Sequence, residues 1–184
     1  MATFANSTVT GAYETHFSSG HTQADTPVSR AFGPLLMQLS DMAAAESRLE
    51  TPGVDVCSAA FGDDLRQANV SREALIEAAF DVIAAPVMRD EDRGLHRMAG
   101  LLVTLFQMDH SAGRRVLLAQ AAQHQDVFDI RGTSPAARQA RGMQVAFFQL
   151  LDGMAKMREF GGPGLAAPVP ATSPLAETPD LIPA

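Results

Sequence analysis

Histidine and aspartate residues gather near both ends of one segment, RDEDRGLHRMAGLLVTLFQMDH, which covers residues 89–110. Asp92 and His96 are four residues apart near its start, and Asp109 and His110 close it. An imidazole beside a carboxylate can hold a metal ion or supply polar contacts to a ligand. On one continuous helix, however, the two histidines would lie roughly 21 Å apart, which is too far for them to share a metal ion.

Metal-binding helices have recognisable spacings, and this chain has none of them. A two-histidine site on a helix needs i,i+4 spacing, and carboxylate-bridged di-iron bundles use Glu-x-x-His; neither pattern occurs here. We therefore expect no metal ion, no cofactor and no catalytic set, and an enzyme is the less favoured class. An alternative remains, in which a pocket between helices takes its polar contacts from Asp92, His96, Asp109 and His110.

Two further features have both a structural and a functional interpretation. Cys57, the single cysteine, lies in VDVCSAAF, a pattern that indicates an apolar helical face, so we expect a buried and inert thiol. Arg89, Arg93 and Arg97 are spaced by four and form the best basic patch in the chain. Such a stripe is suited to an anion or an acidic partner, although a solvated helix face is the more frequent explanation.

The elements that would position these residues are helices. Between residues 26 and 160, alanine, leucine and methionine dominate while β-branched and aromatic residues are sparse, which favours helix over strand. In the 89–110 segment, Asp90 is the expected N-cap, and apolar residues follow at spacings of three and four. A helix start is expected at Thr26-Pro27, where Thr26 is the N-cap, and a break at Gly33-Pro34 should divide this region into a short turn and a longer helix over 34–50. The other helices are expected from Thr51-Pro52, over 71–85 with Ser71 as cap, over 110–126 with Asp109 as cap, and from Ser134-Pro135 to a stop at Gly161.

Segments of different composition flank this helical domain of residues 26–160. Residues 1–25 are rich in Ser, Thr, Gly and Ala, and we expect a disordered N-terminal arm. Residues 161–184 hold six of the eleven prolines, and we expect a disordered Pro- and Ala-rich tail. Near its end, the apolar pair Leu181-Ile182 is set among prolines, which suits it to dock on a partner as a short peptide.

Charge and hydropathy exclude several partners. The net charge is −7 with no basic run, whereas binding nucleic acid requires clustered Lys and Arg to neutralise phosphates. The segment SREALIEAAFDVIAA (71–85) resembles the first helix of TetR-type repressors, but the helix-turn-helix that the resemblance implies does not follow, and no family is assigned. No uncharged apolar run reaches the length of a membrane span and no secretory pattern is present, so we expect a cytoplasmic protein.

Together these features predict an all-α protein of five or six helices, packed as a bundle or an irregular helical array between a disordered N-terminal arm and a Pro-rich C-terminal tail. The favoured function is a non-enzymatic protein–protein interaction module, a regulatory, adaptor or assembly subunit that uses helix faces and its terminal segments. Its partner is expected to be a protein, and self-association as a homo-oligomer is plausible. One alternative is a small-molecule-binding protein or enzyme with a pocket near His96 and His110; another is a structural component of a larger particle.

Overall fold

The computed structural model describes residues 25–51, 53 and 55–163 of the 184-residue chain. Within these ranges the chain is all-α and contains no strand, which confirms the predicted fold class. The predicted docking pair, Leu181 and Ile182, lies outside the described residues, as do nearly all of the predicted arm and tail. The helices are α1 (Pro27–Leu49), α2 (Ala59–Ala84), α3 (Asp90–Gln107), α4 (Ser111–Gln123) and α5 (Pro135–Met154), with two short 3-10 helices, η1 (Gln125–Phe128) and η2 (Arg158–Phe160).

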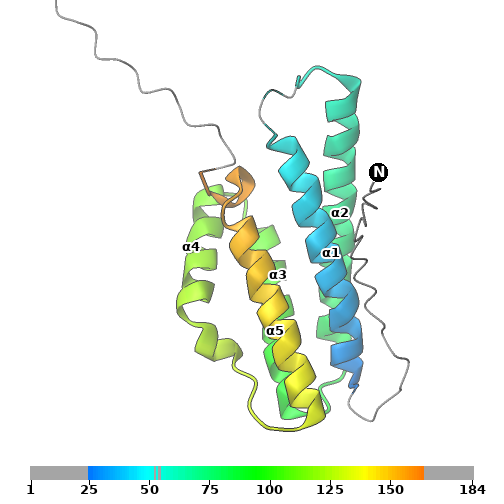
Figure 1. Ribbon diagram of the computed structural model, residues 1–184, viewed down its shortest axis with the longest axis vertical. Helices are drawn as coiled ribbons and strands as arrows, with labels where there is room; N and C mark the ends of the chain where they lie inside the picture. Colours follow the sequence, from blue (N-terminus) through cyan, green and yellow to red (C-terminus); the bar gives the residue numbers. More distant parts are fainter. Residues whose placement is uncertain (1–24, 52, 54, 164–184) are drawn as a thin grey trace, which may run out of the picture.

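The two longest helices, α1 and α2, form an antiparallel hairpin, and α3 and α5 pack against it (Figure 1). Helix α4 stands on the other side of α3 and α5 from this hairpin, and it joins the bundle through α3 and η2. The start of α1, the end of α2 and the start of α3 therefore lie at one end of the molecule (Figure 1). In the described part of the chain, no helix is both long enough and apolar enough to cross a membrane.

The core lies where α1, α2, α3 and α5 meet, because each of these helices presents an apolar stripe at spacings of three and four. Burial of one large apolar side chain contributes about 1.5–3 kcal/mol, so these stripes supply most of the driving force for the fold. The largest fully buried side chains are those of Phe32, Leu35, Leu39, Met42, Leu75, Leu95, Met98, Leu102, Leu105, Phe147, Met154 and Phe160.

Helix α1 is continuous, so the predicted break at Gly33-Pro34 is wrong. The start itself agrees with the prediction, since Thr26 is the N-cap and Pro27 the first helical residue. Thr26 and Ser29 cap the helix reciprocally: Ser29 N donates to Thr26 Oγ1 at 3.1 Å, and Thr26 N donates to Ser29 Oγ at 2.9 Å. Pro34 lies on the solvent-facing side of α1, as does Arg30, whose carbonyl loses its helical donor. Water can satisfy that carbonyl, and the buried residues on the opposite face hold the helix together.

Helix α2 is also a single helix, and it starts later than the sequence predicts. Its N-cap is Ser58, whose Oγ accepts from Phe61 N at 3.1 Å, so a start at Thr51-Pro52 is wrong. Ser71 is not a cap but a buried residue inside α2, where packing against α1 keeps the helix continuous. Cys57 precedes this helix and is exposed, so the expected burial of the thiol is wrong too.

The remaining boundaries show which local signals decide a helix end. Ser134 caps α5 as predicted, since its Oγ accepts from Ala137 N at 2.9 Å. The N-cap of α3 is Arg89 rather than Asp90, and that of α4 is His110 rather than Asp109. Helix α5 ends at Met154, and η2 then carries the chain to Gly161, which has a left-handed φ of 81°.

Candidate functional site

Asp92 is 1% exposed, and its carboxylate accepts three hydrogen bonds. One oxygen accepts from Thr26 Oγ1 at 2.5 Å, and the other accepts from Met88 N at 2.8 Å and Arg89 N at 3.0 Å. These bonds fasten the start of α1 and the α2–α3 connection to the first turn of α3. The carboxylate that the sequence singles out is therefore used to join three segments of the fold.

The histidines and the second aspartate lie apart from this cluster. His96 Nε2 is 3.0 Å from the carbonyl oxygen of Ala85, to which it donates in the tautomer that carries its proton on Nε2. Asp109 and His110 are exposed in the connection between α3 and α4, at the opposite end of α3. An 18-residue helix is about 27 Å long, so Asp92 and His96 do not share a pocket with Asp109 and His110.

The three arginines of the predicted stripe have different surroundings. Arg89 is the N-cap residue of α3, and its side chain lies at the surface. Arg93 is exposed and pairs with Asp90 at 3.6 Å. Arg97 crosses to the segment after α4, where its Nη1 donates to the carbonyl oxygen of Val127 at 2.5 Å. Two of the three thus stay at the surface near the α2–α3 connection, and the third binds the protein's own backbone.

Large apolar side chains are exposed beside these arginines. Phe80 and Ile83, one turn apart near the end of α2, are 50% and 38% exposed, and Val87 and Met88 in the following connection are 43% and 68% exposed. We call these four residues, together with Arg89 and Arg93, the α2–α3 corner. Sequence reasoning missed it, although a signal was present: Phe80 and Ile83 directly follow the buried Ala79 and Val82, so the apolar face of α2 is wider than one neighbour can cover.

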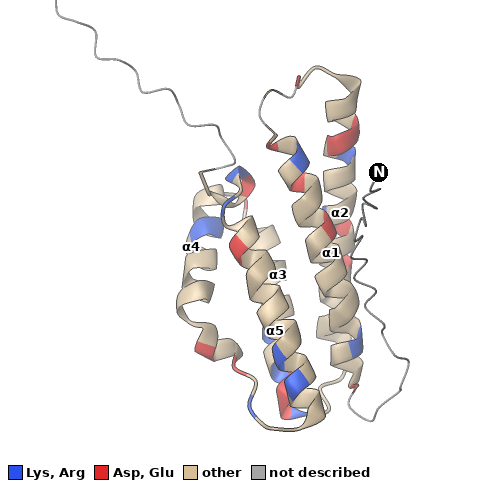
Figure 2. Cartoon of the chain, in the orientation of Figure 1, with Lys and Arg blue, Asp and Glu red and all other residues tan. Residues whose placement is uncertain are grey.

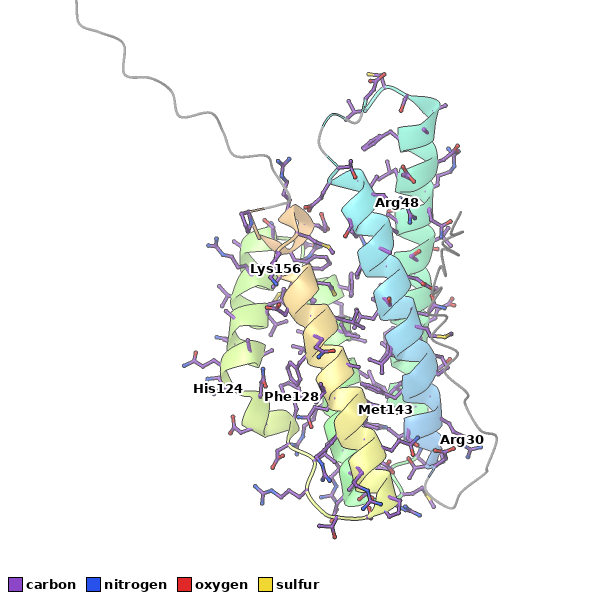
Figure 3. The ribbon with its side chains drawn as sticks, in the orientation of Figure 1. Arg30, Arg48, His124, Phe128, Met143 and Lys156 are labelled. Carbon is purple, nitrogen blue, oxygen red and sulfur yellow. The ribbon has the colours of Figure 1, made fainter. Side chains whose placement is uncertain are left out.

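A second surface feature separates α4 from α5. It is a cavity of about 230 Å³ that continues into a shallower depression along α5, and we call the two together the α4–α5 groove. Its apolar floor is formed by Leu118, Phe148 and Leu151. The ring of Phe148 is held from behind by that of Phe128 of η1, 5.5 Å away and edge to face. Figure 3 shows Lys156 at one end of the groove, and His124 and Phe128 at the other.

The Lys156 end of the groove is rich in charge (Figure 2). Arg115 lies on the α4 side, exposed, and lines the cavity. On the α5 side, Lys156 Nζ donates to Asp152 at 2.6 Å, which offsets the carboxylate in the groove lining. The neighbouring Arg114 is mostly buried and pairs with Glu159 of η2. This groove depends on where α4 rests, and no local pattern in the sequence indicates it.

The structure defines the chain as an all-α bundle with two apolar surface features, the α2–α3 corner and the α4–α5 groove. Among the described residues, no group of three or more His, Cys, Asp or Glu side chains is arranged to hold a metal ion. No protein-family model, curated protein sequence or solved structure matches the chain. The function must therefore be argued from the surfaces of this molecule itself.

Proposed function

We propose that the chain is a non-enzymatic protein–protein interaction module whose partner binds at the α2–α3 corner. The observation that carries this proposal is the exposure of four large apolar side chains within the nine residues from Phe80 to Met88. Monomeric proteins rarely leave such groups together in water, and where they do the surface usually binds a partner. Phenylalanine, methionine and arginine, which meet at this corner, are also the residue types enriched at protein interfaces.

The energetics indicate what kind of complex the corner supports. Full burial of one such side chain contributes about 1.5–3 kcal/mol, and these four are already partly covered, so together they contribute roughly 3–6 kcal/mol. Association itself costs at least about 4 kcal/mol, so apolar burial alone gives weak binding. Arg89 and Arg93 lie next to the apolar group and are suited to acidic side chains of the partner. A regulatory or adaptor role, in which the complex forms and dissociates, agrees with this balance.

The test compares two variants of the full chain in which serine replaces exposed apolar side chains, either at the corner or away from it. Phe80→Ser with Met88→Ser alters the corner, and Val70→Ser is the control, because Val70 is 59% exposed on the same helix but far from the corner. Affinity capture with quantitative mass spectrometry should recover the same partner with the wild type and with the control. We expect at least about a tenfold loss with the corner variant. Equal recovery with all three proteins would refute the proposal.

A second measurement identifies the case in which the partner is another copy of the chain. Sedimentation equilibrium of the wild type and of Val70→Ser would then show a molar mass that rises with concentration, whereas the corner variant would remain a monomer. Thermal denaturation of all three proteins shows whether the substitutions leave the fold intact, which is expected because every substituted side chain is exposed.

A further inference from the structure

The α4–α5 groove has the dimensions of a site for a short extended peptide. Its lining residues run along α5 from Gln144 to the C-cap Ala155, which corresponds to about 16 Å along the helix axis. About five residues of extended chain span that distance. The cavity over Leu118, Phe148 and Leu151 is apolar and too small for most drug-sized ligands, which occupy about 300 Å³ or more, but one or two aliphatic side chains fit it.

The chain leaves the described structure at one end of this groove. Gly161 packs so closely on the first turn of α4 that a Cβ atom there would lie 2.7 Å from Ser111 O and 2.9 Å from Arg115 Cβ. Arg115 itself lines the groove. Everything that follows Pro163 in the sequence is therefore tethered within a few residues of the groove.

We propose that the C-terminal segment LAETPDLIPA, residues 175–184, binds in the α4–α5 groove of its own chain, with Leu181 and Ile182 on the apolar floor. Leu181 is 18 positions beyond Pro163. A flexible chain of that length has a root-mean-square span of about 23 Å, and a fully extended polyproline II chain reaches about 56 Å. Both exceed the length of the groove, so the segment returns to it without strain.

Charge and conformation both favour this occupant. Glu177 and Asp180 precede the apolar pair in the sequence, while Arg115 lies at the charged end of the groove, where Lys156 offsets the charge of Asp152. Prolines on both sides of Leu181-Ile182 favour an extended backbone, which reduces the entropy lost on binding. Tethering adds an effective concentration on the order of 1 mM, so even a weak contact keeps the groove occupied.

The experiment uses full-length variants and a fluorescent peptide of residues 175–184 added in solution. Leu181→Asp with Ile182→Asp frees the groove, and the control, Leu165→Asp with Val169→Asp, changes the same tail outside the segment. For a peptide that binds with a Kd of about 0.1 mM, competition from the tethered segment weakens binding to the wild type and to the control by about tenfold relative to the freed groove. Adding Val145→Arg, at an exposed position on the groove wall, should abolish binding to the freed groove.

Amide hydrogen exchange supplies an independent readout. Exchange in α4 should be faster in Leu181→Asp/Ile182→Asp than in the wild type, and unchanged in the control. The proposal is overturned if the freed groove binds no peptide, if Val145→Arg leaves binding intact, or if α4 exchanges equally in all proteins. Protection that rises with protein concentration would assign the groove to the tail of a second copy and would also overturn it. None of these results depends on the α2–α3 corner.

Discussion

Replacement of Asp92 by alanine removes one acceptor group that serves three donors. The hydroxyl of Thr26 is buried and would lose its acceptor, which costs about 1–3 kcal/mol. The amides of Met88 and Arg89 belong to exposed residues and can bind water instead, so each loses about 0.5–1 kcal/mol. The higher helix propensity of alanine returns about 0.5 kcal/mol. We expect a net loss of about 2–4 kcal/mol and a fall in Tm of roughly 5–15 °C.

Urea denaturation of Asp92→Ala measures this loss, and Asp90→Ala is the matched control. Asp90 is also a carboxylate in the first turn of α3, but it is exposed, so we expect a change of no more than about 0.5 kcal/mol. Asp92→Asn keeps an acceptor oxygen for the amides of Met88 and Arg89, so its stability should lie between those of Asp92→Ala and Asp90→Ala. A double-mutant cycle with Thr26→Val should give a coupling free energy of about 1 kcal/mol or more.

The result that would refute this reasoning is equal stability of Asp92→Ala and Asp90→Ala. A carboxylate kept for ligand chemistry rather than for the fold is commonly dispensable for stability, and its removal can even stabilise the protein. Preserved stability in Asp92→Ala would therefore support the alternative in which Asp92 binds a ligand. A large loss, with coupling to Thr26, would support its role as the junction of α1, the α2–α3 connection and α3.

Three further predictions concern glycine and cysteine. Gly94→Ala should lower the unfolding free energy by about 1–2 kcal/mol, because a Cβ there would lie 2.7 Å from the buried side chain of Ile130. Gly100→Ala meets open space and should raise the unfolding free energy by about 0.5–1 kcal/mol. Urea titration compares the two variants. Gly161→Ala should lower Tm by several degrees, since it combines a φ of 81° with a clash against α4; an unchanged Tm would contradict the close approach. Cys57 is exposed and should react with a thiol reagent in the folded protein nearly as fast as in urea; protection would contradict its placement.

The fold class followed from the sequence because helix-forming composition and apolar periodicity act locally. Ser134-Pro135 shows the same principle, since an N-cap and the proline after it need only their own neighbours to begin a helix. Local signals failed where packing over many residues opposed them. Ser71 resembles an N-cap, yet it lies on the face of α2 that α1 covers, and continuous burial there outweighs one capping bond.

The candidate site was harder to predict because spacing identifies a residue's face but not its partner. Asp92 and His96 are correctly placed one turn apart, yet Asp92 accepts from Thr26, 66 positions earlier, and His96 binds the end of α2. Neither partner has a signature in the sequence around residue 92. The sequence shows that the apolar face of α2 is wide enough to include Phe80 and Ile83. Whether a neighbouring helix covers these two side chains depends on the whole fold.

The two surfaces can be tested separately because they share no residue: one lies at the α2–α3 connection and the other between α4 and α5. The α2–α3 corner surrounds the start of α3, whereas the tail leaves the fold beside Arg115, next to the far end of that helix (Figure 1). A corner variant should therefore leave peptide binding in the groove unchanged, and Leu181→Asp/Ile182→Asp should leave capture at the corner unchanged. If the tail variant instead loses the partner while the corner variant keeps it, the tail rather than the corner contacts the partner. In that case the partner, and not the groove of its own chain, is what Leu181 and Ile182 bind.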